Sequence, residues 1–253
     1  MHTQPVLITG GAKRVGRAIA QHLANRGHPI AIHYNRSKPE AEALVQALQQ
    51  RGVKACAVQA DFSVPCDTNA LFDRAASAIG PIHHLINAAS IFTRDTLQSV
   101  TAESFFSHQQ VNLLTPLRLI QSLQRHVAHH RLTHASIINL GDGIKGWSMS
   151  PLFLSYTLSK LGLAELAPLL ASELAPTIRI NTLALGLTLA GTMDGDDVFA
   201  RLAEKTPLKQ TSSLEDVCQA IDYLLGATNV TGQLLSLSGG RHLSSYSPDH
   251  SCT

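Results

Sequence analysis

Short apolar runs rich in β-branched residues alternate with longer amphipathic segments along nearly the whole chain. The apolar runs predict strands at 5–9, 29–34, 54–61, 83–90, 135–142, 178–185 and 234–240. Apolar residues at helical spacing predict helices at 14–27, 38–52, 101–130 and 155–173. This alternation is typical of a parallel sheet with helices on both faces. We therefore expect an α/β fold with a single Rossmann-type, doubly wound parallel sheet of about seven strands.

The pattern continues without a proline- or glycine-rich linker and without an internal repeat. We therefore expect one domain over residues 1–245, followed by a disordered polar tail over 246–253. Residues 188–210 show no consistent pattern of either helix or strand. We interpret this segment as a mobile lid over the carboxyl ends of the strands.

Composition narrows the class of protein. Hydrophobic residues make up 44% and charged residues 15% of the chain, as in a globular protein with a large core. A formal net charge of +2 is too small to indicate a nucleic-acid or membrane partner. No apolar run reaches the roughly 18 residues that span a bilayer. The first residues lack the pattern of a secretion signal, and the cysteines show no C-x-x-C spacing, so we expect a cytoplasmic protein with free thiols.

A glycine-rich turn follows the first predicted strand, in the segment TGGAKRVG (9–16). Gly10, Gly11 and Gly16 allow a tight backbone turn that approaches a pyrophosphate at the positive end of the next helix. Arg14 stands where the usual dinucleotide fingerprint has a small residue, and its guanidinium suits a phosphate oxygen or a polar substrate. A purely structural turn is the alternative, but its place between a strand and an amphipathic helix favours nucleotide binding.

The end of the second predicted strand favours NADP(H) over NAD(H). An acidic residue at this position binds the ribose 2′-hydroxyl of NAD, whereas this chain has HYNRS (33–37). Arg36 and Ser37 occupy the place of a 2′-phosphate, and Lys13 adds positive charge. Asp61, at the end of the third strand, is placed to accept a hydrogen bond from an adenine amino group. The alternative for Arg36 is a solvated loop charge.

Tyr156 and Lys160 lie four residues apart on a predicted helix, so their side chains leave the same face. A lysine cation near a phenol lowers the phenol pKa from about 10 toward neutrality and makes the tyrosine a usable acid. A Y-x-x-x-K spacing often arises by chance. Here, however, it follows both the glycine-rich turn and the segment NAAS (87–90).

Together these motifs resemble those of the short-chain dehydrogenase/reductases. The resemblance covers nearly the whole chain and includes TGGAKRVG, NAAS, Asn112 in VNLLTP, Tyr156 with Lys160, and VTGQLLSLSGG (230–240). Within that family the chain is most similar to the pteridine reductases and bacterial dihydromonapterin reductases. That subgroup shares the T-G-x-x-x-R-x-G turn, an HY-x-RS segment, and aspartate where most relatives have serine.

The resemblance implies a homotetramer, and it implies roles for Lys160 on the nicotinamide ribose, Asn112 in a water-mediated proton relay, and Phe92 stacked on a pterin. The catalytic candidates are Asp142, Tyr156, Lys160 and Asn112. The cofactor-binding candidates are Gly10, Lys13, Arg14, Val15, Gly16, Tyr34, Asn35, Arg36, Ser37, Asp61, Phe62, Asn87, Ala88, Ala89, Lys160, Gly186 and Thr188. The substrate-binding candidates are Arg14, Ser90, Phe92, Asp142 and Tyr156.

Asp142 is the aspartate that replaces the usual serine. A serine hydroxyl stabilises the negative charge that grows on a carbonyl oxygen, whereas a carboxylate repels that charge. Reduction of a C=N bond instead delivers a proton to nitrogen. We hypothesise that Asp142 and Tyr156 supply this proton, while Arg14 faces the polar edge of a pterin.

The favoured function is NADPH-dependent reduction of a dihydropterin, such as dihydromonapterin, dihydrobiopterin or dihydrofolate, to its tetrahydro form. One alternative is a carbonyl or quinone reductase of the same superfamily. Another is a weakly catalytic NADP(H)-sensing protein, since Ala88 and Leu185 depart from the family pattern, as does Ser238 elsewhere in the chain. Retention of Tyr156 and Lys160 argues against a sensor, which needs no proton donor.

Histidines in RHVAHHRLTHAS (125–136) suggest a second kind of site. His126 and His130 are one helical turn apart, with His129 adjacent. No carboxylate or cysteine accompanies them at ligand spacing, so we expect a solvated helix face and no metal. His242 is expected at an oligomer interface or at the edge of the substrate.

Overall fold

The computed structural model describes residues 3–143, 151–189 and 196–243. Its strands are β1 (Val6–Ile8), β2 (Ile30–Tyr34), β3 (Ala55–Gln59), β4 (His84–Asn87), β5 (Ala135–Asp142), β6 (Ile178–Leu185) and β7 (Leu234–Leu237). Its helices are α1 (Arg14–Asn25), α2 (Lys38–Gln50), α3 (Thr68–Ile79), α4 (Ala102–Gln109), α5 (Thr115–His130), α6 (Leu154–Leu174), α7 (Asp196–Glu204) and α8 (Leu214–Gly226). A π-helical turn, η1 (Gln110–Leu114), joins α4 to α5, and a 3-10 helix, η3 (Arg241–Leu243), follows β7.

The seven strands form one parallel sheet in the order β3-β2-β1-β4-β5-β6-β7. This confirms the fold class expected from the sequence. The chain winds outward from β1 to β3 on one side, then returns to place β4 on the other side of β1. Where the winding reverses, the carboxyl ends of β1 and β4 leave a crevice in which α/β proteins bind ligands.

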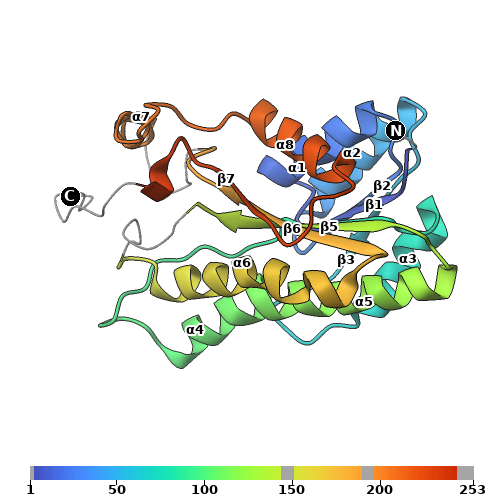
Figure 1. Cartoon of the computed structure of the whole chain (residues 1–253), viewed down its shortest axis with the longest axis horizontal. Coiled ribbons are helices and arrows are strands. Elements are labelled where there is room, and N and C mark those ends of the chain that lie inside the picture. The colour runs from blue at the N-terminus through green and yellow to red at the C-terminus, as the bar shows by residue number, and fades with distance from the viewer. Residues whose placement is uncertain (1–2, 144–150, 190–195, 244–253) are drawn as a thin grey trace.

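Helices cover both faces of the sheet, as Figure 1 shows, with α1, α2 and α8 on one face and α3, α5 and α6 on the other. Successive strand residues point to opposite faces, so they enter two separate cores. Leu7 packs in the core under α3, α5 and α6, whereas its neighbours Val6 and Ile8 pack in the core under α1, α2 and α8. Burial on both faces explains why the strands read as continuous apolar runs.

Three helices, α3, α7 and α8, were not predicted from the sequence. Asp67 caps α3 by accepting hydrogen bonds from the backbone N–H groups of Asn69 and Ala70. Ser213 and Asp216 form a reciprocal capping box at the start of α8. Both are recognised start signals for helices, so the sequence contained information that the apolar pattern alone did not reveal.

The helix predicted at 101–130 is continuous, but η1 interrupts its α-helical hydrogen bonding. The helix α7 lies within the segment interpreted as a lid, of which residues 190–195 are outside the described residues. The predicted tail, 246–253, is also outside them. No helix in the described part of the chain is both long and apolar enough to cross a membrane.

His126 corrects the expectation of a solvated histidine face. Its side chain is buried, and its Nε2 accepts a hydrogen bond from the backbone N–H of Ile82 at 2.9 Å. His129 and His130 are exposed, as expected. Burial lowers the pKa of His126 to about 4, so the ring is neutral and ties α5 to the start of β4. Within the described ranges, no group of three potential ligands is arranged to hold a metal ion.

Candidate active site at the carboxyl edge of the sheet

The glycine-rich turn brings the ends of β1 and β4 together. Gly10 has a φ of +63°, and a Cβ on it would lie 3.0 Å from the Cα of Ala89. A Cβ on Gly16 would lie only 2.4 Å from the carbonyl oxygen of Gly10. Only glycine fits at these two positions, because the turn packs backbone against backbone. Because the turn is so tight, a bound pyrophosphate could approach the backbone N–H groups at the start of α1.

His33, near the end of β2, supports this turn through a hydrogen bond to Gly10. It was not among the predicted site residues. Its Nδ1 accepts from the N–H of Gly10 at 3.2 Å, so its Nε2 carries the proton donated to Ala60 O at 3.0 Å. Burial lowers the pKa of His33 to about 4, which keeps the ring neutral. The ring of Phe62 stacks on it at a centroid distance of 3.9 Å. Phe62, a predicted cofactor-binding residue, is thus buried beneath the turn.

Thr9 makes the corresponding link to β4. Its Oγ1 accepts hydrogen bonds from the backbone N–H groups of Ala88 and Ala89 at 2.9 and 3.0 Å. These bonds position the segment that departs from the family pattern at Ala88. The predicted site residue Asn87 lies in the core, where its Nδ2 donates to Asn139 Oδ1 at 2.9 Å.

A cavity of about 410 Å³ opens beside the turn. Its lining comprises Gly10, Ala12, Lys13, Tyr34, Asn35, Arg36, Ser37, Ser63 and Ile91. The fold thus brings six of the predicted cofactor-binding residues to one cavity. Arg36 is exposed, and among the described residues no carboxylate lies within ion-pair distance of it. Lys13 already pairs with Glu40 at 2.6 Å, so it offers less net positive charge than Arg36.

Asp61 lies at the rim of this region in a fixed orientation. Its Oδ1 accepts hydrogen bonds from the hydroxyl and the backbone N–H of Ser63, and from Asn35 Nδ2. The Ser63 bonds lower the pKa of Asp61, so the side chain is a carboxylate at neutral pH. Arg14, at the first position of α1, is exposed and has a φ of +50°. A non-glycine residue in this conformation is strained, and such strain is concentrated at functional sites.

Asp142 and Tyr156 meet at the other end of the site. Asp142 is the last residue of β5, and Tyr156 is in the first turn of α6. The Tyr156 hydroxyl donates to Asp142 Oδ2 at 2.7 Å, a short hydrogen bond to a charged acceptor. The structure therefore brings together two residues that the sequence separates by a loop.

The pKa of Tyr156 is raised well above its ordinary value of 10, because the side chain is buried and faces the Asp142 carboxylate. This corrects the expectation that Lys160 brings the phenol pKa toward neutrality. The Lys160 ammonium is 5.9 Å from the centroid of the tyrosine ring and donates to Leu140 O at 2.9 Å. Tyr156 is thus a neutral hydroxyl that keeps its proton and donates it in a hydrogen bond to Asp142.

Lys160, on α6, is buried against the end of β5. Burial lowers its pKa to about 8, although the Asp142 carboxylate opposes this shift. A lysine in this state changes its charge near neutral pH, and a hydrogen-bonding group placed beside it decides which form prevails. Lys160 and Tyr156 lie on one face of α6, as the i, i+4 spacing predicted.

The side chain of Asn112 is fully engaged with the protein. Its Nδ2 donates to Ile91 O and Ser159 Oγ, both at 3.0 Å. Its Oδ1 accepts from the N–H of Ile91 and from Ser90 Oγ. These bonds use all four positions of an amide side chain. Asn112 therefore clamps the Ser90–Ile91 segment to α6, and the water-mediated relay implied by the family remains a prediction.

Asp95 anchors the start of α6, although no sequence signal singled it out. The residue is 3% exposed, and its carboxylate accepts hydrogen bonds from the N–H of Ser155 at 2.9 Å and from Ser104 Oγ at 3.1 Å. Its backbone also pairs with Leu152 and Leu154. Phe153, the N-cap residue of α6, has no capping side chain of its own. Asp95 supplies that cap from a distant segment and so positions the residue next to Tyr156.

Aromatic rings surround Tyr156 at the part of the site formed by Asp142, Tyr156 and Lys160, which we call the reaction end. Phe92 stacks on Phe153 with a centroid distance of 4.3 Å and meets the edge of Tyr156 at 4.6 Å. Phe92 keeps 48% of its surface exposed. The predicted stacking residue thus has one face supported by protein and a large exposed area. A flat ligand entering beside Tyr156 would meet an aromatic surface.

Ser238 and Gly186 explain one departure from the family pattern. A Cβ on Gly186 would lie 2.6 Å from Ser238 Cα, and a Cβ on Gly143 would lie 2.8 Å from Ser238 Cβ. The small serine therefore fits a close junction between β6, β7 and the end of β5. Its hydroxyl also bonds to His242 Nδ1 at 2.9 Å, which gives His242 a partner within the chain. Thr188 Oγ1 donates to Gly186 O at 3.3 Å.

A family model described as enoyl-(acyl carrier protein) reductase matches residues 10–242. The solved structure of FolM alternative dihydrofolate reductase 1 from Brucella suis, in complex with NADP, has a TM-score of 0.90 and 37% identity over 97% of each chain. The chain therefore belongs to the short-chain dehydrogenase/reductase family.

Further relatives narrow this assignment. Dihydromonapterin reductase of Shigella boydii is 29% identical over 239 residues, which cover 94% of this chain and 97% of the relative. A blue fluorescent protein from a metagenomic library, in complex with NADPH, has a TM-score of 0.86 and 28% identity over 94% of this chain and 97% of its own. Within the family, the chain belongs to the subgroup of the FolM and dihydromonapterin reductases.

Proposed function

We propose that this protein is an NADPH-dependent reductase that converts a dihydropterin, such as dihydromonapterin, dihydrobiopterin or dihydrofolate, to the tetrahydropterin. The observation that carries the proposal is the 2.7 Å hydrogen bond from Tyr156 to Asp142 at the end of β5. A carboxylate here disfavours an oxyanion but suits a nitrogen that must receive a proton. The names of the relatives from Brucella suis and Shigella boydii support the same class of substrate.

The residues present fit NADP(H). Gly10 and Gly16 allow the tight turn at the start of α1 where a pyrophosphate would sit, and the exposed Arg36 and the partly buried Ser37 line the cavity where a 2′-phosphate would lie. Lys160 would contact the nicotinamide ribose. NADPH, when bound, supplies the hydride for the reduction. The relatives solved with NADP and NADPH support this cofactor.

The protein groups then have separate tasks around the substrate. Phe92 offers an aromatic surface to a flat ring, and Arg14 faces its polar edge. Tyr156 stays neutral because its pKa is raised, and its hydroxyl donates a hydrogen bond to Asp142. The pair can pass a proton to the ring nitrogen and recover one from solvent through the partly exposed Asp142. The charge state of Lys160 responds to hydrogen bonds made by bound groups.

The test follows NADPH oxidation by the purified protein with 7,8-dihydropterins and with simple ketones and quinones. We expect turnover of dihydropterins, and we expect Asp142→Asn and Asp142→Ser to lower kcat by about a hundredfold or more with little change in NADPH affinity. Asp73→Asn, on the exposed face of α3, serves as a matched control. Reduction of ketones or quinones alone would instead support a carbonyl reductase, and unaltered turnover in the Asp142 variants would remove the proposed proton role.

A homotetramer is part of the proposal. Phe106 on α4 and Leu158 and Leu169 on α6 are exposed apolar side chains, at 66%, 44% and 70% respectively. Figure 1 shows α4 and α6 on the same outer layer of the molecule. A second copy of the chain packed on this layer would cover them. Light scattering in solution should give four times the chain mass of 27.1 kDa, and a monomer would contradict this part of the proposal.

A further inference from the structure

A second cavity, of about 840 Å³, lies at the opposite edge of the sheet. The amino ends of β1, β4, β5 and β6 meet the end of α8 there, on the side where Figure 1 marks the N-terminus. Its volume is in the range of small-molecule sites. The residues that carry its polar character are Arg26, His28, His84, His134, Arg179 and Asp222. The proposed reductase reaction uses none of them.

Arg179, near the start of β6, is a half-buried cation with unused hydrogen-bonding capacity. It donates to three carbonyl oxygens, those of Leu224, Leu225 and Val230, at 2.9 to 3.1 Å. A guanidinium has five N–H donors. Two donors therefore remain, and in the described part of the chain no carboxylate pairs with Arg179. The carbonyls fix its orientation without neutralising its charge.

His84, the first residue of β4, is a second under-satisfied group in this cavity. Only 6% of its surface is exposed, and its Nδ1 has no hydrogen-bond partner among the described residues. Burial and then the neighbouring His28, His83 and Arg179 lower its pKa to about 3. These neighbouring residues thus make a further positive charge at His84 unfavourable. A negative charge in the cavity would instead be stabilised by them.

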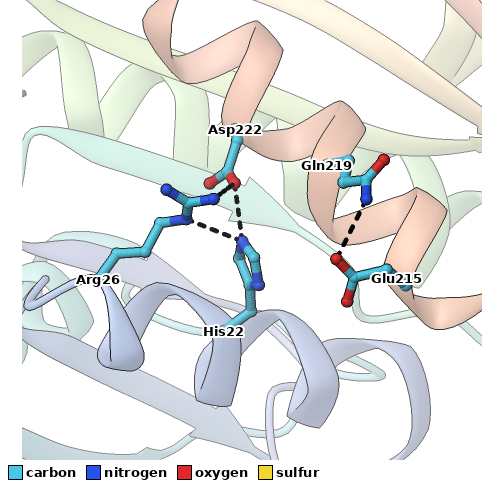
Figure 2. A network of polar contacts seen from close by, with 5 residues as sticks. All are labelled: His22, Arg26, Glu215, Gln219 and Asp222. Carbon is cyan, nitrogen blue, oxygen red and sulfur yellow. Dashed lines mark hydrogen bonds and ion pairs between the residues drawn. The ribbon is translucent and has the colours of Figure 1, made fainter.

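The one carboxylate among the described lining residues is already paired. Asp222 Oδ2 lies 2.7 Å from Arg26 Nη2 and 2.8 Å from His22 Nε2. Figure 2 shows Asp222, on α8, facing His22 on α1 and Arg26, the residue that follows α1. The Arg26 cation balances the Asp222 charge, so Arg179 leaves the cavity with a net positive charge. The histidines add donors without adding negative charge.

We propose that this cavity binds a small molecule through a phosphate or carboxylate group that contacts Arg179 and His84. A guanidinium oriented by carbonyls, with two donors remaining, suits the oxygens of either group. The buried ring of His84 supplies a further hydrogen bond that the protein itself leaves unmade. This site is separate from the candidate active site and does not depend on the proposed reductase function.

Isothermal titration calorimetry on the protein saturated with NADP tests the proposal, with inorganic phosphate and malonate as probes. NADP saturation prevents the probes from entering the cavity beside Arg36. We expect saturable binding of at least one probe, and the probe that binds more tightly identifies the anionic group. Arg179→Gln should weaken binding by about tenfold or more, because it removes the charge-assisted hydrogen bonds.

Thr228→Glu keeps the Arg179 contacts but adds a negative charge on an exposed residue that lines the cavity. It should weaken binding about fivefold. Asn229→Glu is the matched control, since this exposed neighbour is not part of the lining and should change affinity much less. Binding of neither probe would overturn the proposal. Equal affinity in wild type and Thr228→Glu, or an equal loss in Asn229→Glu, would also overturn it.

Discussion

The two ends of the candidate active site are built from different kinds of group. The cofactor end consists of a backbone turn at Gly10 and Gly16 beside an exposed Arg36. The reaction end consists of Tyr156 and Lys160, both buried, and the partly exposed Asp142, which accepts a hydrogen bond from Tyr156. Recognition at the first end depends on shape and surface charge. Chemistry at the second depends on protonation states that burial determines.

The largest effect should come from removing the proton at the reaction end. Tyr156→Phe keeps the ring contacts with Phe92 but deletes the hydroxyl that donates to Asp142. We expect kcat for dihydropterin reduction to fall by about a thousandfold, while NADPH affinity stays near that of wild type. Steady-state kinetics and fluorescence titration measure the two quantities. Tyr223→Phe, at an exposed position on α8, is the control and should leave both quantities unchanged. A loss of NADPH affinity in Tyr156→Phe would show that the two ends are not separate in function.

A methyl group should damage the cofactor end through shape alone. Gly16→Ala places a Cβ 2.4 Å from Gly10 O, which forces the turn apart. We expect a loss of about 3 kcal/mol in the free energy of unfolding and a matching fall in NADPH affinity. Gly52→Ala is a control for a loss of stability without a clash at the turn, since Gly52 has a positive φ but no atom within 4 Å of its added Cβ. That variant should lose stability without losing NADPH affinity.

The stability of the scaffold behind the cofactor end should depend on pH through His33. His33 has a folded pKa of about 4 against an ordinary 6.5, so the unfolded chain takes up its proton first as the pH falls. Stability is complete above pH 6.5 and decreases as the pH falls toward 4. We expect this histidine to contribute a loss of about 2 kcal/mol between pH 7 and pH 5.

Urea unfolding at the two pH values measures this loss. His33→Gln should reduce the pH dependence by about that amount, because glutamine does not titrate. His129→Gln, on the exposed end of α5, should leave it unchanged. If the free energy of unfolding of His33→Gln depended on pH as much as that of wild type, the turn would not depend on a neutral imidazole.

The smallest effect should come from the surface charges of the cofactor end. Arg36→Gln should raise the Kd for NADPH by about tenfold and leave the Kd for NADH unchanged, because only NADPH carries the 2′-phosphate. Lys13→Gln should have a weaker effect, about twofold, since Lys13 already pairs with Glu40. Titrations with both dinucleotides test this order. Equal losses for NADPH and NADH would contradict the placement of the 2′-phosphate at Arg36.

Local pattern was sufficient for much of the sheet. The predicted strands at 135–142 and 178–185 match β5 and β6 residue for residue, because apolar residues there enter both cores. The helix α8 escaped prediction even though Ser213 and Asp216 form a capping box. It was also predictable that the candidate cofactor-binding residues would share one cavity, since a glycine turn and the end of the next strand meet by topology.

By itself the sequence determined the fold class and the glycine turn, and it singled out Asp142, Tyr156 and Lys160 as the candidate catalytic set. The tertiary structure alone decided what surrounds each of them. His33 and Asp95 support the site through partners far away in the chain, at Gly10 and Ser155, which no local pattern reveals. The same limit applies to the pKa of Tyr156, which spacing suggested would fall and burial beside Asp142 instead raises. Desolvation depends on every segment packed around a group, so only the folded chain can set it.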